Sequence, residues 1–116
     1  MELKTKIEYY TTLEGKNPVS DFLDSLSGKQ QGKVLRVLQT IAEYGLLSVL
    51  PHLKKLTGTA LWEIRILGKD NIRIFYVVPY KERVLLLHGF IKKKQKTSPK
   101  EIAIALQRFA EWAARK

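Results

Sequence analysis

The 116-residue sequence has no cysteine and only two histidines. The lack of cysteine excludes disulfide bonds, thiol catalysis and zinc sites made of thiolates. The eleven acidic residues are scattered, with no D-x-D, no E-x-x-H and no histidine cluster. A metal-dependent nuclease gathers several carboxylates around its ions. No Gly-rich phosphate loop follows a predicted strand, so we expect neither a metal ion nor a cofactor.

Long apolar runs are also missing. No stretch approaches the roughly 18–20 apolar residues that cross a bilayer, and residues 1–10 lack the apolar core of a signal peptide. We therefore expect a cytoplasmic protein with no membrane partner. The length and the 45% hydrophobic content predict one folded domain over residues 1–116.

Negative charge is scarce relative to positive charge. The chain has 21 Lys and Arg residues against 11 Asp and Glu residues, a formal net charge of +10. Such an excess in so small a domain favours a polyanionic partner, which could be nucleic acid, an anionic membrane surface or an acidic protein.

The first half of the chain predicts one strand and two helices. Residues 3–10 alternate with period two, which is typical of a strand. Asn17 and Pro18 form a helix start, and Ser27 with Gln30 forms a capping box that opens a second helix ending at Gly45. The predicted buried faces are Val19, Phe22, Leu23 and Leu26 in the first helix and Val34, Leu35, Leu38, Ile41 and Ala42 in the second. Residues 46–58 stay ambiguous, because Pro51 argues against one continuous helix.

The second half predicts three strands and a last helix. Residues 61–67 and 71–78 alternate and are joined by a turn at 68–71, and residues 83–91 are apolar on both faces, as in a central strand. Ser98 and Glu101 form a second capping box, opening a helix with the inner face Ile102, Ala105, Leu106, Phe109 and Ala113. The order β-αα-βββ-α predicts an α+β fold, an antiparallel-rich sheet with its helices packed on one face.

Arg65 and Arg73 are the first candidate site residues. Alternation places both on the face that carries Glu63, opposite Trp62, Ile64 and Ile66. Two arginines on one sheet face offer a fork geometry that suits phosphate. The alternative is a pair of solvated or salt-bridged arginines, one of them bonded to Glu63.

Two groups of lysines form the second candidate. Lys54 and Lys55 precede the strand of Arg65, and Lys92, Lys93, Lys94 and Lys96 follow the last strand. If these strands are neighbours, the two groups flank the arginine face and form a groove for a nucleic-acid backbone. The alternative is plain solvation of a charge run.

His88 is the only histidine within a predicted strand, on the same alternation set as Val84, Leu86 and Phe90. A lone histidine there is more often a hydrogen-bonded core residue than a base. With metal chemistry set aside, a reaction run by cations remains. RNA cleavage fits such a site, because RNA supplies its own nucleophile in the 2′-hydroxyl.

Two stretches carry a family resemblance. "LWEIRILGKDNIRIFYVV" and "LLLHGFIKKKQKTSPKEIAIALQR" resemble the phage-derived, Gp49-like or HigB-like branch of the RelE/HigB/ParE toxin superfamily, over roughly residues 2–110. The resemblance implies the toxin of a type II toxin–antitoxin system, a ribosome-dependent mRNA interferase that cuts without metal and leaves a cyclic phosphate. Its implied partners are mRNA, the ribosome and a cognate antitoxin, commonly of the helix-turn-helix type.

The resemblance also assigns roles to residues. It implies that Arg65 stabilises the phosphate and that Arg73 is as much structural as catalytic. It also implies that Lys54, Lys55 and the cluster of Lys92, Lys93 and Lys94 contact rRNA and mRNA. We add Lys96 to the RNA-binding residues, and Lys93 and His88 to the catalytic ones. The tyrosine or histidine that follows the last strand in many relatives is replaced here by "FIKKKQK". The general base is therefore open, and a lysine with a lowered pKa is one possibility. Two other functions also stay open, a ParE-like non-enzymatic gyrase inhibitor and a plain RNA- or DNA-binding module.

Overall fold

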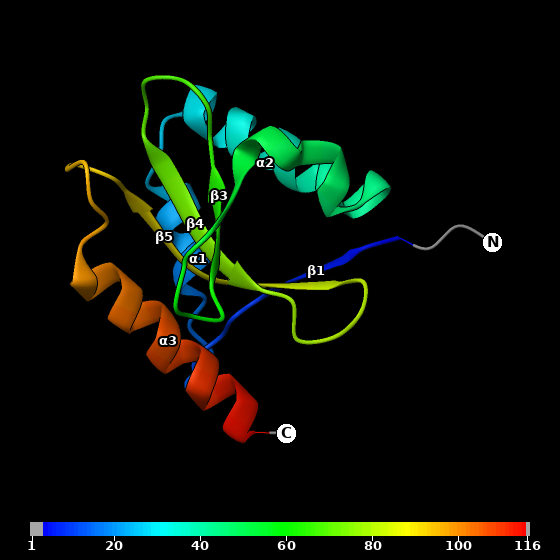
Figure 1. The fold of residues 1–116 in the computed structure, drawn as a ribbon, viewed down its shortest axis with the longest axis vertical. Helices are drawn as coiled ribbons and strands as arrows, with labels where there is room; N and C mark the ends of the chain where they lie inside the picture. Colours follow the sequence, from blue (N-terminus) through cyan, green and yellow to red (C-terminus); the bar gives the residue numbers. More distant parts are fainter. Residues whose placement is uncertain (1–3, 116) are drawn as a thin grey trace.

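The computed structural model describes residues 4–115, which fold into one five-stranded sheet with helices on both faces (Figure 1). The elements in chain order are β1 (Lys6–Tyr9), α1 (Pro18–Asp24), α2 (Gly28–Tyr44), the 3-10 helix η1 (Leu46–His52), β2 (Leu53–Lys55), β3 (Trp62–Arg65), β4 (Ile72–Val77), β5 (Arg83–Ile91) and α3 (Pro99–Ala114). The predicted α+β class is confirmed.

The sheet has the strand order β1-β5-β4-β3-β2. β1 runs parallel to β5, and the other three pairs are antiparallel. β5 is hydrogen-bonded on both edges, and residues Val84 to Leu87 are buried. Its prediction as a central strand is therefore confirmed.

The expected packing of all helices on one face is wrong. α1 and α2 cover one face, where their side chains pack against Ile72 and Ile74 of β4. α3 covers the other face and packs against Phe75 and Val77 of the same strand; in Figure 1 it lies at the lower left, apart from α2 at the top. Both sides of β4 are apolar, so each side needs a cover.

The sheet has one strand more than the sequence predicts. The ambiguous stretch divides into η1, which contains Pro51, and the short edge strand β2, which pairs with β3. A strand of three residues is too short to show a readable alternation, and this is why the pattern missed it.

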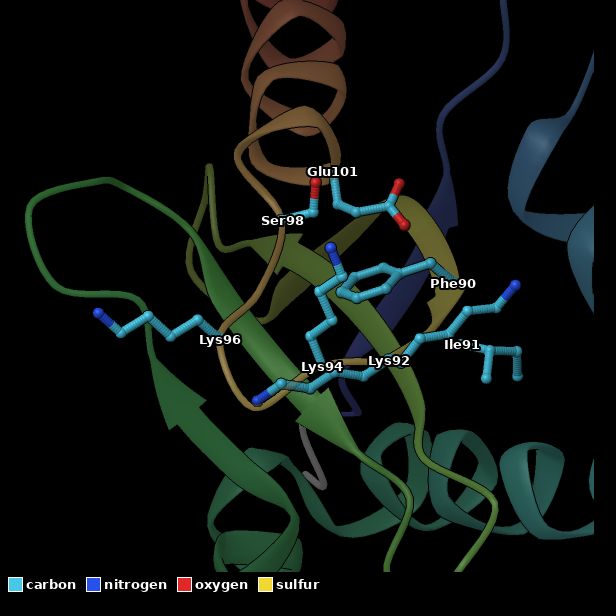
Figure 2. Close-up of a pocket in the computed structure, with 8 residues that line it drawn as sticks. Phe90, Ile91, Lys92, Lys94, Lys96, Ser98 and Glu101 are labelled. Atoms are coloured by element: carbon cyan, nitrogen blue, oxygen red, sulfur yellow. The ribbon is translucent and has the colours of Figure 1, made fainter.

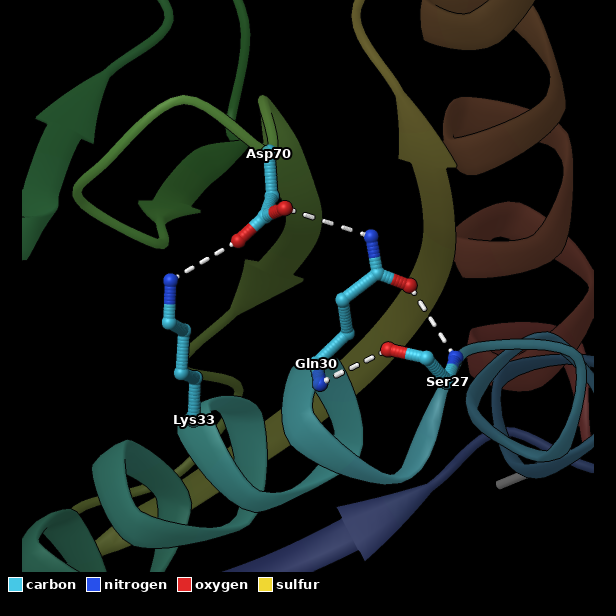
Figure 3. Close-up of polar contacts among 4 residues, drawn as sticks. All are labelled: Ser27, Gln30, Lys33 and Asp70. Carbon is cyan, nitrogen blue, oxygen red and sulfur yellow. Dashed lines mark hydrogen bonds and ion pairs between the residues drawn. The ribbon is translucent and has the colours of Figure 1, made fainter.

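The start of α2 follows the sequence prediction and adds a long-range contact (Figure 3). Ser27 Oγ accepts from Gln30 N, and Gln30 Oε1 accepts from Ser27 N, which completes the capping box. The Gln30 side chain also donates to Asp70, which forms an ion pair with Lys33 at 2.8 Å. Hydrogen bonds from Lys33 and Gln30 lower the pKa of Asp70. The turn between β3 and β4 is thus tied to the first turns of α2.

The faces of the two long helices differ in part from the prediction. In α2 Val37 is buried while Leu35 is exposed, and in α3 Trp112 is buried while Leu106 and Ala113 are exposed. An apolar stripe wider than the contact leaves its outer members in solvent, and the stripe alone does not show where the sheet lies.

A β-bulge in β5 changes which face its second half presents. Phe75 pairs with His88, but the next residue, Tyr76, pairs with Leu86, so Leu87 is the extra residue. Leu86 then packs toward α1 and α2, whereas Leu87 and Phe90 pack toward α3. The prediction that His88 shares the face of Leu86 is therefore wrong.

No helix within residues 4–115 combines the length and the apolar character needed to cross a bilayer.

Candidate nucleic-acid interface

Residues 92–96, here called the lysine segment, follow β5, and a backbone hydrogen bond fixes the first of them. Lys92 N donates to Asn71 O at 2.8 Å, which continues the pairing of β4 and β5 by one bond. Beyond it the chain lines a hollow of about 280 Å³ before α3 begins. The lining residues are Phe90, Ile91, Lys92, Lys93, Lys94, Lys96, Ser98 and Glu101. Figure 2 shows Lys94 extending along the Phe90 ring toward the end of the hollow where Ser98 and Glu101 lie.

A second hollow of about 280 Å³ adjoins the first and shares three of its lysines. Its lining is Asn71, Arg73, Lys92, Lys93, Lys94 and Gln95, which includes four cations, two amides and no carboxylate. Lys93 and Lys94 are exposed, while Lys92 and Arg73 are half-buried. The structure therefore brings the predicted Arg73 and the lysine segment together. Such a set of donors is suited to an anionic oxygen ligand.

The guanidinium of Arg73 forms an ion pair with the buried carboxylate of Glu63. Its Nε lies 2.8 Å from Glu63 Oε1, and the Glu63 side chain is only 3% exposed. The Arg73 Nη1 donates to the carbonyl of Ile72 at 3.2 Å. The predicted alternative, an arginine paired with Glu63, is correct for Arg73. This pair fixes the guanidinium and balances part of its charge, so the lysines supply most of the uncompensated charge of the hollow.

Arg65 is directly opposite Arg73 in the register of β3 and β4 but lines neither hollow. Its Nη2 is 3.5 Å from Pro51 O, and its own carbonyl is 2.8 Å from His52 Nδ1. The Nε of Arg65 is buried and has no hydrogen-bond partner within residues 4–115. The guanidinium is thus directed toward η1, away from the lysine segment.

Lys54 and Lys55 of β2 lie on opposite faces of the sheet. Lys54 is paired with Glu63 and so shares the face of the arginines, whereas Lys55 is paired with Trp62, whose ring centroid lies 5.6 Å from its Nζ. The Lys55 ammonium also donates to the carbonyls of Thr59 and Leu61. The condition set for the groove, that β3 and β5 are neighbours, is wrong, because β4 lies between them. Lys54 still lies on the face of the arginines, whereas Lys55 does not.

His88 is clamped between two residues of α3. Its Nε2 is 2.9 Å from Glu101 Oε1, and its Nδ1 is 3.2 Å from Arg108 Nη1, which also donates to the carbonyl of Leu87 at 2.9 Å. The ring stacks on Phe90 with centroids 5.5 Å apart. Burial lowers the pKa of His88, an effect that Glu101 partly opposes. These contacts assign the neutral tautomer, with Nε2–H donating to Glu101 and Nδ1 accepting from Arg108.

The second predicted capping box does not form. Ser98 Oγ accepts from Lys100 N, and the Glu101 carboxylate binds His88 in place of the backbone of Ser98. Glu101 is therefore a member of the lysine-lined hollow, a placement that the sequence analysis missed, together with Arg108. The sequence shows only that Glu101 and Arg108 are two helical turns apart on one face of α3. It does not show the bulge in β5 that turns His88 toward them.

Among residues 4–115, no three His, Cys, Asp or Glu side chains come together as a metal site. The charged groups that line the two hollows within residues 4–115 are all cationic except Glu101, which lines the first.

Comparison with known proteins gives one family match. No curated protein matches the sequence. The family model described as phage derived protein Gp49-like (DUF891) matches residues 21–110, which is more than half of the chain. The match spans both arginine strands, the lysine segment and most of α3. The chain belongs to this phage-derived Gp49-like family, the Gp49/HigB-like toxins, and this membership implies a cognate antitoxin as its partner.

Proposed function

We propose that this toxin is a ribosome-dependent mRNA interferase, an endoribonuclease that cuts mRNA and is neutralised by a helix-turn-helix antitoxin. One observation carries the proposal. Arg73, Lys92, Lys93 and Lys94 line a single hollow that contains no carboxylate. Four cations with no acid among them suit a phosphate diester whose charge increases during the reaction.

The proposed reaction needs little from the protein besides positive charge and proton transfer. The 2′-oxygen of the RNA loses its proton and bonds to the adjacent phosphorus, and the bond from phosphorus to the 5′-oxygen breaks. The products are a 2′,3′-cyclic phosphate and a 5′-hydroxyl, which takes up one proton. The cations of the hollow stabilise the pentacoordinate intermediate, on which an extra negative charge develops.

The remaining basic surface supports a large RNA partner. Lys54 lies on the same face as the hollow, across the two arginine strands, and Lys96 lines the adjoining hollow. With the net charge of +10, this arrangement favours a partner that surrounds the cleaved strand with further phosphates, as the ribosome does.

The test uses a reconstituted translation reaction in which mRNA ends are mapped by primer extension. The variant is the double charge reversal Lys93→Glu with Lys94→Glu, since both side chains are exposed and line both hollows. We expect the wild-type protein to cut inside translated codons and the variant to cut at a rate reduced at least about 100-fold. Because neither lysine is buried, the midpoint of thermal unfolding should change little.

The matched control is Lys16→Glu with Lys29→Glu. These lysines are also exposed, line neither hollow and give the same change in net charge. The control should retain cleavage. Equal loss in both double variants would mean that only overall charge matters, as in a plain RNA-binding module. Intact mRNA with the wild-type protein would refute the interferase and direct the search to gyrase.

A further inference from the structure

We propose that Glu101 is the general base of the cleavage reaction and that His88 is the residue that positions it. The inference rests on the proposed function, because it names the group that accepts the proton of the 2′-hydroxyl. The sequence analysis left this group open.

The two oxygens of Glu101 have different surroundings. Oε1 is 2.9 Å from His88 Nε2, while Oε2 has no hydrogen-bond partner among residues 4–115. The Glu101 side chain is 25% exposed and lines the hollow together with Lys92, Lys93 and Lys94. One oxygen is therefore fixed by the protein, and the other is open to a hydroxyl group of a bound RNA.

His88 is less suited to accept the proton itself. Its side chain is 13% exposed, and both ring nitrogens are engaged, Nε2 with Glu101 and Nδ1 with Arg108. Phe90 stacks on the ring, and Arg108 is further fixed by the carbonyl of Leu87. The imidazole thus holds the carboxylate in one orientation, as the outer partner of a catalytic pair does.

The proton balance of the step closes across the two adjoining hollows, with the phosphate in the carboxylate-free one and Glu101 in the other, which shares Lys92, Lys93 and Lys94 with it. Glu101 Oε2 takes the proton of the 2′-hydroxyl while the 2′-oxygen bonds to phosphorus. As the bond to the 5′-oxygen breaks, a lysine ammonium donates a proton to that oxygen. Lys94, which extends toward the Glu101 end of the hollow in Figure 2, is placed for this role. Proton exchange with water then restores both groups.

The decisive variant is Glu101→Gln, which keeps an oxygen that can accept from His88 but cannot take a proton. It is tested under single-turnover conditions on programmed ribosomes with two mRNAs. One mRNA is natural, and the other carries sulfur in place of the 5′-oxygen at the bond that the wild-type protein cuts. A thiolate leaves without a proton, so the second mRNA removes the need for a general acid but not for a general base.

We expect Glu101→Gln to cut both mRNAs about 10²–10⁴-fold more slowly than the wild type, with a half-saturating protein concentration within about threefold of the wild-type value. Lys94→Met should be slow on the natural mRNA and recover on the sulfur-containing one. Glu14→Gln serves as the control, since this carboxylate is exposed and lines neither hollow, and the variant should cut at the wild-type rate.

His88 is tested by comparing two substitutions. His88→Gln can place an amide N–H near the position of Nε2 and should keep at least about tenfold more of the saturating rate than His88→Ala. Equal rates in the two variants would contradict the positioning role.

Three results would overturn the assignment of Glu101. These are a Glu101→Gln rate within about threefold of the wild type, recovery of that variant on the sulfur-containing mRNA, or a loss explained by weaker ribosome binding. Each is distinct from failure of the proposed function, in which the wild-type protein itself leaves both mRNAs intact.

Discussion

Gly89 in β5 leaves room for the Phe22 ring of α1 to pack against the sheet, and replacing it with alanine tests that packing. A Cβ at this position would lie 2.4 Å from Phe22 Cδ2, 2.8 Å from Cε2 and 3.1 Å from Cγ. Phe22 packs against the core from α1, so relief requires the ring to leave that contact or the helix to shift. Overpacking of this kind costs about 1–3 kcal/mol. Alanine also lowers the conformational entropy of the unfolded chain, which raises the free energy of unfolding by about 0.4–1 kcal/mol.

We therefore expect Gly89→Ala to lower the free energy of unfolding by about 1–2 kcal/mol, measured by urea denaturation. Gly32→Ala is the matched control, because Gly32 lies exposed in α2 with nothing within 4 Å of a new Cβ. It should raise the stability by up to about 1 kcal/mol. In a Phe22→Ala background the cost of Gly89→Ala should vanish. A gain in stability for Gly89→Ala, or an equal loss without the Phe22 ring, would refute the argument.

Two further predictions concern Glu63 and His88, which pair with the hollow-lining residues Arg73 and Glu101. Glu63→Ala should lower the free energy of unfolding by about 3 kcal/mol in urea titrations, because Arg73 would keep a largely buried charge without its partner. A loss below about 1 kcal/mol would show that Arg73 reaches solvent at little cost. Burial lowers the pKa of His88 below 6.5, so the unfolded chain binds this proton more readily, and stability should fall as the pH drops below 6.5. His88→Asn should remove that part of the pH dependence, and an unchanged slope would contradict it.

Local signals predicted the helix starts well. The side chain of Asn17 caps α1 and Ser27 caps α2, as the sequence indicates, because a cap depends on residues three positions apart. The predictions that failed depend on distant parts of the chain. A three-residue strand such as β2 is defined by its pairing with β3, and the buried stripe of α3 depends on which face of the sheet it covers.

In the candidate site, too, the features that depend on local sequence were predicted, and those that depend on distant parts of the chain were not. The lysine segment was visible as a charge run, and Arg73 could be assigned to a sheet face by alternation. The contact of Glu101 with His88 was not predictable, because the two residues belong to different elements and meet only after the bulge at Leu87. The direction of Arg65 toward Pro51 depends on η1, which the pattern left ambiguous.

The bulge at Leu87 shifts the alternation of side chains in β5 by one residue. Before the bulge, the even-numbered residues Val84 and Leu86 face α1 and α2, and after it the even-numbered residues His88 and Phe90 face α3. A single inserted residue thus moves His88 from the side of α1 to the side of α3, while Gly89 turns toward Phe22. Residues on both sides of the bulge are constrained by the core, but only those after it also line the hollow, so a substitution after the bulge affects packing and the site together.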